Sequence, residues 1–314
     1  MKKRYPVKKA LVLLLSVFMI MSHFALASAE EADSPVFTVA SPEGAPGLAL
    51  ATLAAADPDH YTFLAAETIT AEFSSQEADF IIAPLNAGAR LYLNGKSSYK
   101  LAAVVSWGNL YLASQKDQFQ PEDINGAELT LFGENTINSS ITLYALEQNG
   151  IQPASVSYLA GAANTQQLLL TDENAIVLTA EPALTAAQAK NDHITGCPVN
   201  DLFQEATGND GFTQAGLFVK AETAENQPEA VEAYLQQVEE SCEKCLSDLE
   251  SVAQAAVTLE LLPNEKIAMS AIPHCSIRYM PAWEAKEQIE MTANIDIAQF
   301  GGSLPADDFY YGAQ

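Results

Sequence analysis

The fold is decided in the stretch Phe37-Thr-Val-Ala-Ser-Pro-Glu-Gly-Ala-Pro-Gly-Leu-Ala-Leu50, where a break rich in proline and glycine separates two apolar runs. The first run favours a strand, and the second, which continues to Ala56, consists of strong helix formers. Pro42, Gly44 and Gly47 mark a tight connection between the two. The stretch therefore predicts a strand, a glycine-rich loop and a helix, which is the repeating unit of an α/β protein.

This glycine-rich loop is also the first candidate binding element. In open α/β sheets, ligands bind outside the carboxyl ends of the strands, where such loops lie. The N–H groups at a helix N-terminus are unpaired and carry a partial positive charge. Glu43, Gly44 and Gly47 would therefore offer a ligand one carboxylate and several N–H groups. The alternative is an ordinary strand-to-helix turn, because a few glycines do not make a phosphate motif.

The first 29 residues have the pattern of a secretory signal peptide. Five basic residues precede the apolar stretch from Ala10 to Met21, and small residues follow it up to an expected cleavage site after Ala29. The apolar run is short for a membrane span, which needs about 20 residues, and an uncleaved anchor is the alternative. No cysteine lies near the cleavage site for lipid attachment. We therefore expect a soluble, extracytoplasmic protein.

Composition predicts a globular protein with an acidic surface. The chain has 314 residues, 48% of them hydrophobic, which is enough for two domains of ordinary size. Its net charge of −25 would repel nucleic acids and anionic lipids, so neither is an expected partner.

Four cysteines, Cys197, Cys242, Cys245 and Cys275, would be exported to a compartment that favours oxidation. They allow three pairings, and the sequence does not choose among them. Cys242 and Cys245 form a C-x-x-C pattern but lie on the apolar stripe of a predicted helix. They are therefore predicted as core cysteines or disulfide partners, and no metal site is expected because the histidines are scattered.

Strand and helix patterns alternate in two sets, which predicts two lobes and a mostly parallel sheet in the first. A second set follows the polar segment 114–123, and a strand at 213–220 returns to the first set. Most of the remaining chain is expected to be helical. We predict lobe 1 at residues 30–114 plus 221–314, lobe 2 at residues 115–220, and a ligand cleft between them. In the first set, strands are expected at 61–65, 78–85, 101–105 and 109–113.

Polar residues after the predicted strands complete the candidates for ligand binding. Asn86 can donate and accept hydrogen bonds, and the ring of Trp107 can stack on a planar ligand. The alternatives are a core position for Trp107 and helix capping for the second-lobe residues. The second-lobe candidates are Glu134, Thr136, Asn138, Ser139 and Glu181.

Two segments near the C-terminus carry a resemblance to a known family. They are Ala271-Ile-Pro-His-Cys-Ser-Ile-Arg-Tyr279 and Phe300-Gly-Gly-Ser-Leu-Pro-Ala-Asp-Asp-Phe-Tyr-Tyr311. These segments resemble those of ABC-transporter substrate-binding proteins of the NMT1/ThiY-like group, which have the type II periplasmic-binding-protein fold. The loop Phe132-Gly-Glu-Asn-Thr136 departs from that family and leaves the ligand open. The lipobox cysteine common in Gram-positive relatives is missing.

The resemblance implies a two-lobed α/β protein that captures a small molecule by hinge closure and delivers it to an ABC permease. The expected partners are thus a small-molecule ligand and this permease. The protein itself is expected to be a monomer without a cofactor. The sequence offers no nucleophile with an assignable base, so no catalytic residue is expected. Two other functions stay open, a soluble biosynthetic enzyme on the same fold and a ligand-binding receptor ectodomain.

The charges near the predicted cleft indicate the class of ligand. Glu43, Glu134 and Glu181 fall at candidate strand ends, whereas the sequence places neither Arg90 nor Arg278 there. A buried carboxylate needs a partner, so we expect a neutral or cationic, planar nitrogen-containing ligand such as a pyrimidine or a thiamine-like compound. Nitrate and sulfonates should bind poorly. The alternative is an anion held by helix N-termini.

Overall fold

The computed structural model describes residues 36–312. The predicted signal peptide lies outside these residues. From Phe37 onward the chain forms one compact unit. Among the described residues, no helix combines the length and the apolar character that crossing a membrane requires.

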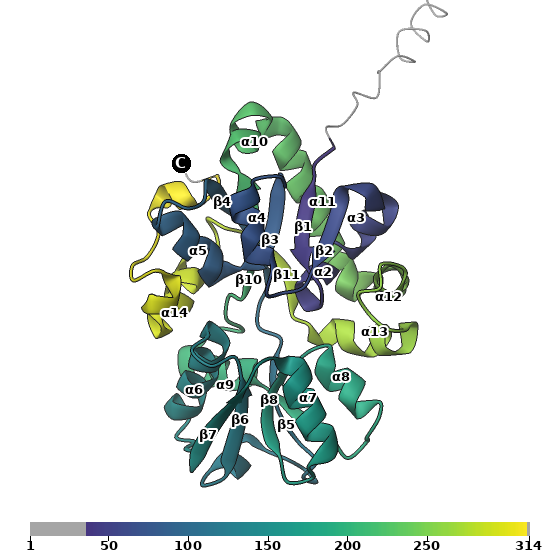
Figure 1. Ribbon diagram of the computed structural model, residues 1–314, viewed down its shortest axis with the longest axis vertical. Helices are drawn as coiled ribbons and strands as arrows, with labels where there is room; N and C mark the ends of the chain where they lie inside the picture. The colour runs from purple at the N-terminus through teal and green to yellow at the C-terminus, as the bar shows by residue number, and fades with distance from the viewer. Residues whose placement is uncertain (1–35, 313–314) are drawn as a thin grey trace, which may run out of the picture. The chain divides into compact units, whose positions relative to one another are not determined.

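Six strands form a first sheet in the order β11-β4-β10-β3-β1-β2 (Figure 1). β1 pairs in parallel with β2 and β3, whereas β10 runs antiparallel to β3 and β4, and β11 antiparallel to β4. The sheet is therefore mixed, and the expectation of a mostly parallel sheet is wrong. The reason is that β4 leaves this sheet for the second one and β10 returns from it, so these neighbours must run in opposite directions. The strands are β1 (Val39–Pro42), β2 (Tyr61–Leu64), β3 (Phe80–Pro84), β4 (Tyr99–Ser106), β10 (Ala215–Lys220) and β11 (Ile277–Pro281).

A second mixed sheet has the order β7-β6-β8-β5-β9. β6 is parallel to β7 and β8, and β5 is antiparallel to β8 and β9. The sequence did not predict β9 or β11, which are short, edge-lying and without a long apolar run. The strands are β5 (Leu110–Ser114), β6 (Glu128–Phe132), β7 (Ser155–Leu159), β8 (Ile176–Ala180) and β9 (Thr195–Pro198).

The chain passes between the two sheets twice, at residues 107–109 and again at residues 211–214 (Figure 1). β5 therefore belongs to the second sheet and β10 to the first. The strand predicted at 213–220 does return to the first sheet, although the lobe boundary was placed after residue 220. The boundary predicted after residue 114 differs because an apolar strand does not reveal from its own residues which sheet it will join. The two lobes as moving units stay a prediction.

Two helices begin earlier than the sequence pattern indicated, which favoured helices at residues 89–94 and 141–149. α5 starts directly after β3 and α6 starts at residue 137, so Asn86 and Asn138 both lie in first helical turns. The single helix expected after Gly47 is divided into α2 and α3. The helices are α2 (Ala45–Leu48), α3 (Ala51–Ala56), α4 (Glu72–Ser75), α5 (Leu85–Leu93), α6 (Ile137–Gln148), α7 (Ala162–Thr171), α8 (Ala183–Gln188), α9 (Val199–Thr207), α10 (Ala221–Asn226), α11 (Pro228–Ser247), α12 (Leu249–Thr258), α13 (Glu265–Ala271) and α14 (Lys286–Ile295).

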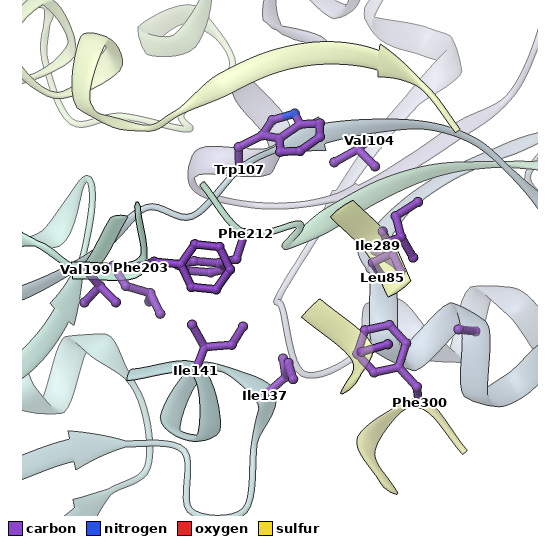
Figure 2. Close-up of a cluster of buried hydrophobic side chains, with 14 of the residues drawn as sticks. Leu85, Val104, Trp107, Ile137, Ile141, Val199, Phe203, Phe212, Ile289 and Phe300 are labelled. Atoms are coloured by element: carbon purple, nitrogen blue, oxygen red, sulfur yellow. The ribbon is translucent and has the colours of Figure 1, made fainter. Parts of the chain in front are cut away.

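Hydrophobic residues cover both faces of the first sheet, as expected for the apolar strand β3. Ile81 and Ala83 belong to one buried cluster, whereas Ile82 belongs to another, because side chains alternate along a strand. The first cluster continues past the crossing segments into the second sheet. At the second crossing, Phe212 packs on Phe203 of α9 with ring centroids 5.6 Å apart (Figure 2). The crossing segments are therefore fixed by hydrophobic contacts as well as by the strands they join.

The four cysteines are free thiols, and Cys242, Cys245 and Cys275 are buried in the second cluster. This agrees with the prediction of core cysteines. Burial raises the pKa of the Cys245 thiol to about 12, and burial also raises the pKa of the Cys242 thiol well above its ordinary value. Since the thiolate is the reactive form, these residues act as apolar packing groups.

Candidate functional site

A cavity of about 630 Å³ lies where loops from both sheets meet. Its walls come from the segments that follow β1, β3, β6, β7 and β8, together with both crossing segments. The segments after these five strands stand at the carboxyl ends of the strands, which is the usual position of ligand sites in α/β sheets. The cavity is larger than those of about 470 and 230 Å³ elsewhere in the described residues.

The wall from the first sheet contains three of the predicted residues, Glu43, Gly44 and Asn86. Gly44 has a φ of 85°, and a Cβ there would meet open space, so the left-handed conformation explains the glycine. The N–H of Glu43 donates to the carbonyl oxygen of Leu64 at 2.8 Å, so this group is already paired within the protein. Asn86 has a buried Oδ1 atom without a hydrogen-bond partner among the described residues.

Arg90 also lines this wall, although the sequence did not place it there. It follows Asn86 by four residues on α5, and residues at this spacing share one face of a helix. The spacing was visible in the sequence, but it became informative only once the helix was known to start at Leu85. Arg90 is exposed and forms no ion pair with another described residue.

Two predicted residues of this region, Gly47 and Trp107, do not line the cavity. A Cβ on Gly47 would lie 2.9 Å from the carbonyl oxygen of Pro42, so this glycine lets α2 pack against β1. Trp107 is 2% exposed, and its indole N–H donates to the carbonyl oxygen of Arg278 at 2.9 Å. The guanidinium carbon of Arg278 lies 4.2 Å from the centroid of the same ring. Trp107 is thus a core residue that does not line this cavity, and its stacking on a ligand stays a prediction.

The wall from the second sheet contains Thr136 and Asn138 at the N-terminus of α6. Thr136 is the N-cap, and its hydroxyl donates to the carbonyl oxygen of Gly133 at 2.7 Å. Ser139 is buried, donates to the same carbonyl oxygen at 2.8 Å, and accepts from the N–H of Thr136 at 3.3 Å in the capping box of α6. Glu134 is exposed and does not line the cavity. The capping alternative therefore holds for Ser139, whereas Thr136 both caps the helix and lines the cavity.

Glu181 lines the cavity at the end of β8 and is only 4% exposed. Its Oε1 accepts from the hydroxyl of Thr185 at 2.9 Å, and its Oε2 accepts from the N–H of Thr185 at 3.2 Å. Burial raises the pKa of Glu181, an effect that these two hydrogen bonds and the charge of His274 oppose. This carboxylate is therefore held by the protein before any ligand arrives.

The cavity wall is rich in carboxamide side chains. A carboxamide both donates and accepts hydrogen bonds, so such a wall suits a small polar molecule with several donors and acceptors. Within the described residues, no cluster of His, Cys, Asp or Glu could hold a metal ion. The lining carboxamides are Asn86, Asn109, Asn135, Asn138, Gln214 and Gln299, and the lining charged residues are Glu43, Glu67, Glu181 and Arg90.

Comparison with known proteins agrees with this architecture. Residues 99–250 match the family described as NMT1/THI5 like. The chain has the periplasmic-binding-protein fold and resembles the NMT1/THI5-like family. A search of curated proteins gave no match.

Solved structures with this fold include transport proteins. An ABC transporter protein from Parabacteroides distasonis is 22% identical, with a TM-score of 0.76 over 90% of this chain and 100% of that chain. The periplasmic aliphatic sulphonate binding protein SsuA from Escherichia coli is 15% identical, with a TM-score of 0.67 over 90% and 94% of the two chains. A Candida albicans protein that exhibits the generic periplasmic binding protein fold is 10% identical, with a TM-score of 0.53 over 88% and 93%.

Proposed function

We propose that this protein is the extracytoplasmic solute-binding component of an ABC importer, which holds a small molecule in the cavity and delivers it to a permease. The observation that carries the proposal is the cavity itself, which is lined from both sheets at the carboxyl ends of their strands. A site divided in this way opens and closes when the two halves move relative to each other. The resemblance to the NMT1/THI5-like family and the expected signal peptide support the same function.

The crossing segments would act as the hinge. Gly108 has a φ of 85°, and a Cβ there would lie 2.5 Å from Oδ1 of Asn200 and 2.6 Å from the ring of Phe212. The Nδ2 atom of Asn200 donates to the carbonyl oxygens of Trp107 and Gly108, each at 2.9 Å. Helix α9, which carries Asn200, thereby holds the first crossing from one side, so closure would turn about a defined point.

We propose a neutral or cationic, planar nitrogen-containing ligand. Three carboxylates line the cavity against one guanidinium, so a ligand with N–H donors meets more acceptors than a simple anion does. The carboxamides add both donors and acceptors, which match the edges of a pyrimidine. Arg90 is the group that would favour an anion instead. Its contribution to binding therefore distinguishes an anionic ligand from a neutral or cationic one.

Calorimetry with uracil, cytosine, thiamine, riboflavin, nitrate and taurine tests this proposal. A pyrimidine or thiamine-like compound should bind, should be recovered unchanged, and should stabilise the protein by about 2.7 kcal/mol at 100 times its Kd. Glu181→Gln should weaken that binding, and Arg90→Gln is the matched variant for the single cation. Tight taurine or nitrate binding that survives Glu181→Gln and is lost in Arg90→Gln would overturn the ligand class. Conversion of a compound to product would assign the protein to the enzymes.

A further inference from the structure

Gln214 connects the two crossing segments with the cavity wall. It lies in the second crossing, and its Oε1 atom accepts from the backbone N–H of Asn109 in the first crossing at 3.2 Å. The same Oε1 accepts from the hydroxyl of Ser106 at 3.3 Å. Its Nε2 atom donates to Oδ1 of Asn138 at 3.4 Å. Gln214, Asn109 and Asn138 all line the cavity, so this chain of hydrogen bonds runs from the hinge to the ligand site.

The first of these bonds determines the direction of the others. A carboxamide can usually be turned over, which exchanges its donor and acceptor ends. A backbone N–H can only donate, so the end of Gln214 that faces Asn109 must be the oxygen. The nitrogen end of Gln214 is then directed at Asn138, which must present its own oxygen. The Nδ2 group of Asn138 is left without a role in this chain.

We propose that Gln214 is a positioning residue that fixes Asn138 as a hydrogen-bond donor to the ligand. The inference deepens the proposed function and rests on it, because it takes the cavity as the ligand site. Asn138 lies in the first turn of α6, where the unpaired N–H groups of the helix add further donors. This part of the wall therefore recognises a hydrogen-bond acceptor, such as a ring carbonyl oxygen or an unprotonated ring nitrogen.

The side chain of Asn109 is oriented in the same way, but its acceptor end is the one left free. Its Nδ2 atom donates to the carbonyl oxygen of Glu181 at 2.7 Å, which is again an acceptor that cannot change its role. The oxygen of the Asn109 side chain is therefore the end left free. The crossing segments thus orient one cavity carboxamide as a donor and another as an acceptor, which favours a ligand with both kinds of group over a simple anion.

The variant Gln214→Glu replaces the N–H donor directed at Asn138 with an acceptor and keeps the size of the side chain. A carboxylate still accepts from Asn109 and Ser106, but it has no N–H group for Oδ1 of Asn138. Asn138 should then turn over and donate to Glu, leaving its oxygen toward the cavity. A side chain with a purely structural role would not produce this change in a neighbouring amide.

Nuclear magnetic resonance of the ligand-free protein tests the orientation independently of the ligand. The side-chain amide signals of Asn138 and Gln214 are assigned from their loss in Asn138→Asp and Gln214→Glu. In the wild type, the amide protons of Gln214 should exchange with solvent at least several-fold more slowly than those of Asn138. In Gln214→Glu, exchange of the Asn138 amide should become several-fold slower. An unchanged Asn138 signal would overturn the inference.

Gln299→Glu is the matched control for these spectra. Gln299 is also a cavity carboxamide, but it donates to the backbone carbonyl oxygen of Asn135 at 2.7 Å and does not contact Asn138. The Asn138 amide signal should keep its exchange rate in this variant.

Binding of uracil provides the second measurement. Gln214→Glu should weaken uracil binding about tenfold, because one ligand acceptor loses its donor. Undiminished binding to this variant would overturn the inference. If the wild type does not bind uracil or the other pyrimidines, the proposed ligand class fails, whereas the amide signals still decide the orientation of Asn138.

Discussion

The two walls of the cavity use their polar groups in different ways. On the wall from the first sheet, Oδ1 of Asn86 has no hydrogen-bond partner and Arg90 has no ion-pair partner among the described residues. On the wall from the second sheet, Thr136 caps a helix, Glu181 is held by Thr185, and Asn138 accepts from Gln214. The second wall is therefore ordered by its own bonds, and the first wall offers groups that a ligand would complete.

This difference separates stability from recognition. Removing a group that the protein already binds leaves its partner unsatisfied and lowers stability, whereas removing an unpaired group leaves nothing unsatisfied. Removing Thr136, whose bonds lie within the protein, should thus act mainly on folding, and removing the unpaired Asn86 should act mainly on ligand affinity. The predictions below test this division, beginning at the crossing that joins the two walls.

The largest effect is expected for Trp107→Ala at the crossing. Trp107 is buried and holds Arg278 through a hydrogen bond and a cation–π contact, so its removal should lower the free energy of unfolding by about 3–5 kcal/mol. Denaturant unfolding measures the loss. Trp283, which is 42% exposed, is the control, and Trp283→Ala should cost less than about 1 kcal/mol. A Trp107→Ala protein of normal stability that no longer binds ligand would restore Trp107 as a binding residue.

A smaller effect is expected when one residue from each wall is compared. Thr136→Ala removes an N-cap and should cost about 1 kcal/mol of stability. Asn86→Ala removes an unpaired oxygen and should change stability by less than about 0.5 kcal/mol. Uracil affinity should show the reverse order, with the greater loss in Asn86→Ala. If Asn86→Ala proves the less stable variant and binds normally, the division between the walls is wrong.

The smallest effect concerns the pH dependence of Glu181. Because burial raises its pKa above the ordinary 4.5, the folded state binds this proton more readily than the unfolded chain does. The free energy of unfolding therefore falls as pH rises from about 4.5 through the folded pKa, since the folded state holds more protons in that window. The stability of the wild type relative to Glu181→Gln should accordingly decrease as pH is raised from about 4 to about 7. Urea unfolding at several pH values measures this difference.

The exposed carboxylate of Glu43 supplies the control for that measurement. Glu43→Gln removes one negative charge from the opposite wall, so it reports any effect of net charge alone. If the wild type instead gains stability relative to Glu181→Gln as pH rises, burial does not raise the pKa of Glu181.

Local sequence patterns were sufficient for the individual elements. The alternation of apolar runs with glycine, proline and capping residues predicted β2, β3 and β4 and placed Glu43, Asn86 and Glu181 after strands. These features depend on neighbours in the chain, whose spacing fixes which side chains share a face. The two C-terminal segments likewise carried the resemblance to the family that residues 99–250 match.

The tertiary structure alone decided which candidates reach the cavity. Trp107 follows a strand and Asn138 lies in the first turn of a helix, yet Trp107 is in the core and Asn138 lines the site. The sheet that a strand joins, and the role of Gln214, depend on hydrogen bonds between residues far apart in the chain. The identity of a single residue does not indicate such pairings, because an apolar strand can pair equally well with several others until the whole core is packed.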